Sequence, residues 1–152
     1  MVFPFLSYFI LIKMKQLFLF TAFVFISFAS QSQSKTAEEE SMSSMEQGNI
    51  KADNGDWKDA LNDYTNAIGY YPKNGLAYFH SGLAKQNLKD YRGAIMHYSR
   101  AIYFNNTDAS SYYGRGICYI LIGNNQKGCF DLSKASEFGN NDANLAIQSY
   151  CH

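Results

Sequence analysis

The stretch Gly75–Phe104, with the sequence GLAYFHSGLAKQNLKDYRGAIMHYSRAIYF, carries an apolar pattern with helical spacing. In Tyr91–Phe104 the apolar residues recur at spacings of three and four, which places them on one face of a helix. Gly75–Asn87 shows the same helical pattern, with Tyr78 and Gly82 on one side of a second helix. Only the residues LKD separate the two segments, so the sequence predicts a pair of antiparallel helices.

Residues at the ends and in the middle of these helices support the pairing. Asn74 and Asp90 stand where a side-chain oxygen can cap the first turn of each helix. Gly82 and Ala94 are small, so we expect the two helices to approach closely at these positions. Ala101 leaves room for the next pair, and the tyrosines are expected to fill the space between neighbouring helices as core residues.

The same pattern recurs at an offset of 34 residues. The coincident positions are Gly48, Gly82 and Gly116; Ala60, Ala94 and Gly128; Tyr64, Tyr98 and Leu132; and Ala67, Ala101 and Ala135. Self-similarity at a fixed period of this length is typical of stacked helical units, none of which can bury its apolar face alone.

This period, the glycine of the first helix, the alanine and aromatic residue of the second, and Pro72 after the first unit resemble the tetratricopeptide repeat (TPR). The resemblance implies an all-α superhelix of antiparallel helix pairs, an α-solenoid with about seven helices. The expected domain spans 42–152, with units 42–73, 74–107 and 108–141 and a closing helix at 142–151. The third unit departs from the pattern, as a terminal repeat often does.

The resemblance also implies a function and a site. In TPR domains the first helices line a concave groove that binds proteins or peptides. The groove positions in this sequence are Met45, Asn49, Phe79, Leu83, Gln86, Tyr113, Ile117 and Ile120. TPR cochaperones that hold C-terminal carboxylates use Lys, Arg and Asn at this surface. Only Asn49 matches that set, so we expect an apolar partner segment and no binding of a free acidic C-terminus.

An alternative stays open for the apolar residues of this expected groove. Phe79, Leu83 and Tyr113 could instead pack against neighbouring helices or against the polar spacer that precedes the first unit. The spacer is expected over 30–41, and the polar run continues to Ser44 and becomes helical toward its end.

The first 29 residues have a different composition from the rest. They contain eight of the twelve Phe, no Asp or Glu, and only the cations Lys13 and Lys15. Leu17–Phe28 is uncharged and is followed by small residues, which is the layout of a secretory signal cleaved after Ala29. Residues 1–13 could be an upstream extension if Met14 is the true start. The sequence thus predicts export to a periplasmic or extracellular space, and the alternative is an uncleaved membrane anchor.

The charge and the motifs of the sequence argue against nucleic-acid binding, a metal site and enzyme activity. Two of the 13 basic residues lie in the leader, so 11 remain against 13 acidic residues, without the basic clusters that nucleic-acid binding needs. His80, His97 and His152 are too dispersed for a metal site. We interpret Gly114-Arg115-Gly116 as a helix-packing glycine beside an exposed cation, and not as a loop that binds phosphate. We therefore expect no enzyme activity, no catalytic residues, no cofactor and no metal.

The three cysteines lie in the third unit and the closing helix. An antiparallel closing helix would bring Cys151 beside Cys129, and in an exported protein this pair can oxidise to a disulfide. Cys118 would then stay free or compete for Cys129. The alternative is that all three are buried thiols.

The leading hypothesis is a noncatalytic exported module that binds a protein or peptide in the groove. A second hypothesis is a membrane-anchored structural or assembly factor that uses the repeats for oligomerisation. A third is a noncatalytic component of an enzyme system whose activity lies on another chain.

Overall fold

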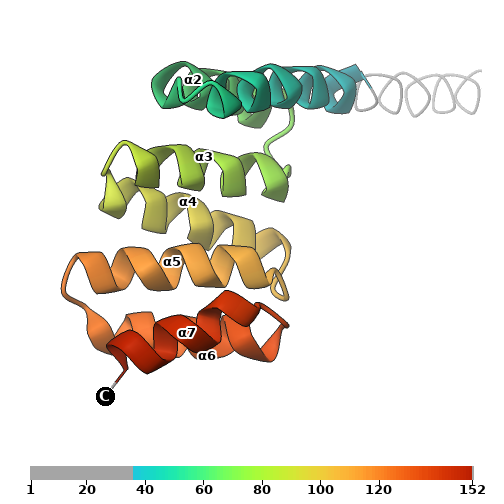
Figure 1. The fold of residues 1–152 in the computed structure, drawn as a ribbon. Coiled ribbons are helices and arrows are strands. Elements are labelled where there is room, and N and C mark those ends of the chain that lie inside the picture. The colour runs from blue at the N-terminus through green and yellow to red at the C-terminus, as the bar shows by residue number, and fades with distance from the viewer. Residues whose placement is uncertain (1–35, 152) are drawn as a thin grey trace, which may run out of the picture. The chain divides into compact units, whose positions relative to one another are not determined.

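The computed structural model describes residues 36–151, and the chain from Glu39 onward forms one compact unit. Residues 36–53 are helical, and the structured elements that follow are α2 (Trp57–Tyr70), α3 (Gly75–Asn87), α4 (Tyr91–Phe104), α5 (Ala109–Leu121), α6 (Asn125–Glu137) and α7 (Asn141–Tyr150). Within the described residues these are seven helices and no strand, which confirms the all-α expectation. From α2 to α7 each helix packs on the next in the sequence, so they form a stack (Figure 1).

The helix starts follow from local side-chain caps. The Asn74 side chain accepts a hydrogen bond from the Ala77 amide at 3.0 Å, and Asp90 accepts one from the Gly93 amide at 2.9 Å. Both caps were expected from the sequence. The Asn140 side chain accepts from the Ala143 amide in the same way, so α7 begins at Asn141, one residue before the expected closing helix.

The core is built from buried tyrosines seated on glycines. Tyr64 and Tyr98 are each 1% exposed. A Cβ added to Gly48 would lie 2.6 Å from the Tyr64 ring, and one added to Gly82 would lie 2.8 Å from the Tyr98 ring. Each glycine of a first helix therefore makes room for the tyrosine of the second helix in its unit.

The third unit packs differently, which accounts for its departures from the repeat pattern. Leu132 replaces the buried tyrosine and is fully buried. A Cβ added to Gly128 would lie 2.9 Å from the Gly116 carbonyl oxygen and 2.5 Å from Ile120. The two glycines thus let α5 and α6 approach closely, and Ile120 fills part of the space that an alanine side chain would otherwise occupy.

The described part of the expected spacer over 30–41 lies in the first described helix. Residues 36–41 are helical, and Ser41 is fully buried. Its hydroxyl donates to the Ala67 carbonyl oxygen at 2.8 Å and accepts from the side-chain Nδ2 of Asn74 at 2.9 Å. The repeat packing therefore includes Ser41, one residue before the expected domain start at 42. Ser41 contacts Ala67 and Asn74, which lie far along the chain. The predicted leader 1–29 and residues 30–35 lie outside the described residues. No helix in the described part is long and apolar enough to span a membrane.

Candidate functional site

Three successive first helices present one equivalent stripe of side chains, which we call the first-helix face. Spacings of three, four and three residues place the members of each stripe on one side of their helix. The members are Met42, Met45 and Asn49 in the 36–53 helix; Leu76, Phe79, Leu83 and Gln86 in α3; and Tyr113, Ile117 and Ile120 in α5.

The most exposed apolar members of this face were not predicted from the sequence. Met42 is 62% exposed and Leu76 is 57% exposed. They stand one repeat apart and three residues before Met45 and Phe79. The 34-residue period together with the helical spacing was the signal that could have found them.

The predicted groove residues are distributed between the core and the surface. Met45 is only 6% exposed and packs in the cluster around Tyr64, so it contributes mainly to the core beneath the face. Phe79 is half-buried against Tyr98, with the ring centroids 5.9 Å apart. Leu83 and Ile120 are also half-buried. Tyr113 and Ile117 are half-buried against the cluster around Leu132. These residues therefore pack with one side and leave the other side accessible.

The two amides of the face are held by the buried tyrosines. The Tyr64 hydroxyl donates to Asn49 Oδ1 at 2.8 Å, and the Tyr98 hydroxyl donates to Gln86 Oε1 at 2.8 Å. The bonds fix the orientation of both side-chain amides, because each carbonyl oxygen is held in place. The NH2 groups are hydrogen-bond donors that a bound backbone carbonyl could accept from.

Each cation of the described first helices is paired with a carboxylate. Lys51 Nζ lies 2.6 Å from Asp63 Oδ2, and Lys85 Nζ lies 2.9 Å from Asp90 Oδ2. Their charges are therefore balanced within the chain.

Arg115 is bound more extensively. Its Nε and Nη2 donate to the two Asp131 oxygens at 2.7 and 2.8 Å, and its Nη1 donates to Ser99 Oγ at 3.0 Å. The side chain of Arg115 is 18% exposed, so the expectation of an exposed cation was wrong. A bidentate pair of this kind fixes the guanidinium and joins α5 to both α4 and α6.

The described histidines take part in packing. The His80 ring stacks on Tyr64 with the ring centroids 5.3 Å apart, and burial lowers the pKa of His80. Burial likewise lowers the pKa of His97. Both rings are therefore neutral at pH 7. Within residues 36–151 no three His, Cys, Asp or Glu side chains gather in a way that could hold a metal ion; His152 lies outside the described residues.

Cys129 and Cys151 form a disulfide, the pairing expected from the sequence, with their Cα atoms 5.7 Å apart. It ties the end of α7 to the first part of α6. Cys118 is free and buried, and burial raises the pKa of its thiol to about 12. At neutral pH this thiol is protonated and behaves as a small core side chain.

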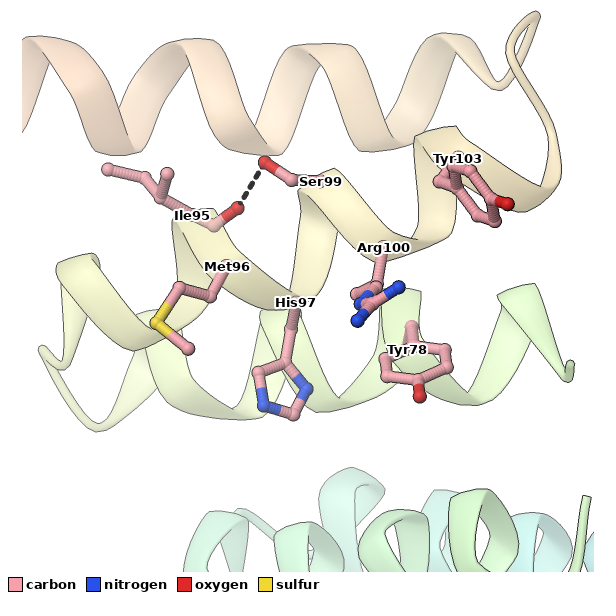
Figure 2. A pocket seen from close by; sticks show the side chains of 7 residues that line it. All are labelled: Tyr78, Ile95, Met96, His97, Ser99, Arg100 and Tyr103. Carbon is pink, nitrogen blue, oxygen red and sulfur yellow. Dashed lines mark hydrogen bonds between the residues drawn. The ribbon is translucent and has the colours of Figure 1, made fainter. Parts of the chain in front are cut away.

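Two pockets lie beside the second helices. One of about 560 Å³ is bounded by Tyr78 of α3 and by residues of α4, which Figure 2 labels. The other, of about 420 Å³, is lined by Arg115, Tyr119, Gln126, Lys127, Phe130 and Asp131. Neither contains a member of the first-helix face. Neither pocket was predicted from the sequence, because outward residues of a second helix resemble ordinary surface positions.

Comparisons with solved structures place this arrangement among known folds. The first TPR domain of Spaghetti (RPAP3), bound to the HSP90 peptide SRMEEVD, is 19% identical over 74% of this chain and 91% of that chain, with a TM-score of 0.73. The chain has the TPR fold.

Two further TPR structures agree. The Arabidopsis OM64 TPR domain is 22% identical over 75% of this chain and 96% of that chain, with a TM-score of 0.74. The second TPR domain of human RPAP3, in complex with the HSP70 peptide SGPTIEEVD, is 17% identical over 78% of this chain and 98% of that chain, with a TM-score of 0.71. No protein-family model and no curated protein matches the sequence.

Proposed function

We propose that this chain is a noncatalytic interaction module that binds a protein or peptide segment along the first-helix face. The observation that carries the proposal is the repetition of accessible apolar side chains on successive first helices, with Met42 and Leu76 more than half exposed. The fold supports it, because TPR domains of RPAP3 have been solved with peptides bound. Such a face suits an extended or helical segment anchored by hydrophobic side chains.

The charges of the face indicate which segments it accepts. Lys51, Lys85 and Arg115 already pair with carboxylates of this chain, so no unpaired cation in the described first helices can receive a terminal carboxylate. The peptide SRMEEVD should therefore leave the NMR signals of Phe79 and Leu83 unchanged. A shift of these signals on addition of the peptide would contradict the proposal that the face binds apolar segments and not an acidic C-terminus.

Side-chain truncation tests the face. The partner is first captured from an extract of the source cells and identified by mass spectrometry, and its affinity is then measured. Phe79→Ala, Tyr113→Ala and Leu76→Ala should each weaken binding, a true anchor by about 2 kcal/mol or roughly 30-fold. Leu145→Ala is the matched control, because Leu145 is 65% exposed on α7 and lies off the face. Undiminished affinity in all three variants, or loss caused only by unfolding, would contradict the proposal.

We also propose that the protein is exported. The composition of residues 1–29 supports a secretory signal, and the Cys129–Cys151 disulfide suits an oxidising compartment. Mass measurement of the natural protein should give a chain that begins at Ser30. An intact leader would favour the alternative, a membrane-anchored assembly factor that uses the repeats for oligomerisation.

A further inference from the structure

The larger pocket opens beside α4, away from the residues of the first-helix face. Figure 2 shows the side chains of His97 and Arg100 on one side of α4, next to Tyr78 of α3. Its volume of about 560 Å³ lies in the range of pockets that hold ligand groups or side chains. The pocket is therefore large enough to receive more than one side chain of a partner.

The charge of the pocket comes from Arg100 alone. None of the seven lining residues is acidic, and Arg100 is exposed and forms no ion pair with another described residue. The nearby Asp90 is held by Lys85 at 2.9 Å, and burial keeps His97 neutral. An anionic group at this pocket would thus meet one unpaired guanidinium.

The second pocket makes a useful contrast, because its cations already have partners. Arg115 is bound to Asp131, and Lys127 Nζ lies 5.6 Å from the centroid of the Tyr119 ring. Of these two pockets, the one at Arg100 is lined by a guanidinium that has no carboxylate partner among the described residues.

Apolar groups flank this cation. Met96 is 68% exposed and Tyr103 is 74% exposed, and both line the pocket. The Tyr78 ring is fixed by stacking on Phe104, with the centroids 5.7 Å apart. Exposed apolar side chains around a single cation are complementary to a ligand that carries an anion beside an apolar group.

We propose that this pocket is a second docking site, which binds an acidic segment of a partner protein in which Asp or Glu stands beside a large apolar side chain. The carboxylate pairs with Arg100, whose planar guanidinium can hold it bidentately. The apolar side chain lies against Met96, Tyr78 and Tyr103. The site is separate from the first-helix face, so one chain can engage two segments.

The test uses short peptides with both ends capped, each with a central Phe or Leu flanked by Asp, Ser or Lys. They are titrated against the protein as isolated from its own cells. We expect the Asp-flanked peptides to bind about tenfold more tightly than the Lys-flanked ones, because a charge-assisted bond forms only in the former. Arg100→Gln should remove this preference, and Met96→Ala should weaken binding of the Phe and Leu peptides.

Two control variants locate the binding. Arg92 is also exposed on α4 but does not line the pocket, so Arg92→Gln should change affinity by less than about twofold. Leu145→Ala should leave the affinity unchanged, because Leu145 is exposed on α7 and belongs neither to the pocket nor to the first-helix face. The proposal is overturned if Asp and Lys peptides bind alike, if Arg92→Gln acts as strongly as Arg100→Gln, or if Leu145→Ala weakens binding as much as Met96→Ala.

Discussion

At the scale of single residues, Lys89 occupies a turn position that the other repeats give to glycine. Its φ is +62°, and the residues one repeat away, Gly55 and Gly123, have φ values of +84° and +82°. The left-handed conformation costs an L residue with a side chain about 1–2 kcal/mol, and glycine adopts it freely. The turn between α3 and α4 is therefore strained relative to its counterparts.

Replacing Lys89 by glycine should stabilise the protein. The relief of strain exceeds the greater flexibility of glycine in the unfolded chain, so we expect Lys89→Gly to raise the free energy of unfolding by about 1 kcal/mol or less. Urea unfolding at neutral pH measures the change. Gly123→Ala is the converse control and should lower stability by a similar amount. A loss of stability in Lys89→Gly would show that the lysine side chain contributes more free energy of folding than its left-handed backbone conformation costs.

At the scale of helices, the disulfide determines how firmly α7 is held. The bridge spans 22 residues, which corresponds to about 3 kcal/mol in the loop-entropy description. α7 also contributes Ala143 and Ala146 to the core cluster around Leu132. Packing and the covalent link therefore both oppose fraying at this end of the stack.

Reduction of the disulfide should loosen α7 before the rest of the chain. After treatment with dithiothreitol we expect faster amide exchange in α7, and a drop of about 3 kcal/mol in the free energy of unfolding. Thiol counting without reductant provides the control: the unfolded chain should expose one thiol, that of Cys118, and the native chain none. Three reactive thiols in the unreduced, unfolded chain would mean that the bridge is absent.

The sequence predicted the elements whose signals are local. α3 and α4 have the expected bounds, because their caps and their helical spacing depend on residues that are close together in the sequence. Two features could not be predicted in this way. The burial of Ser41 depends on contacts 26 and 33 residues away, and the pairing of Arg115 with Asp131 depends on the relative positions of two helices. Both require the packed structure and leave no pattern in the sequence around them.

At the scale of the whole molecule, the core is divided among successive units. One cluster forms around Tyr64, a second includes Tyr98 and Cys118, and a third surrounds Leu132. The middle cluster connects α4 to the helices on both sides. The Tyr98 hydroxyl donates a hydrogen bond to Gln86 of α3, and a Cβ added to Gly114 of α5 would lie 2.5 Å from the Tyr98 ring. Stability is then expected to depend mainly on contacts between neighbouring helices.

Truncating the two equivalent tyrosines should therefore have different effects along the chain. Tyr64→Ala removes contacts with the first described helix and with His80, so amide exchange should rise mainly in residues 36–70 and in α3. Tyr98→Ala removes contacts on both sides, so protection should fall from α3 through α5. Each change should cost about 3–5 kcal/mol locally, as expected for loss of a buried aromatic side chain. Hydrogen exchange followed by mass spectrometry reads both profiles. Identical loss of protection across all helices in the two variants would mean that the stack unfolds as one unit, and the neighbour description would be wrong.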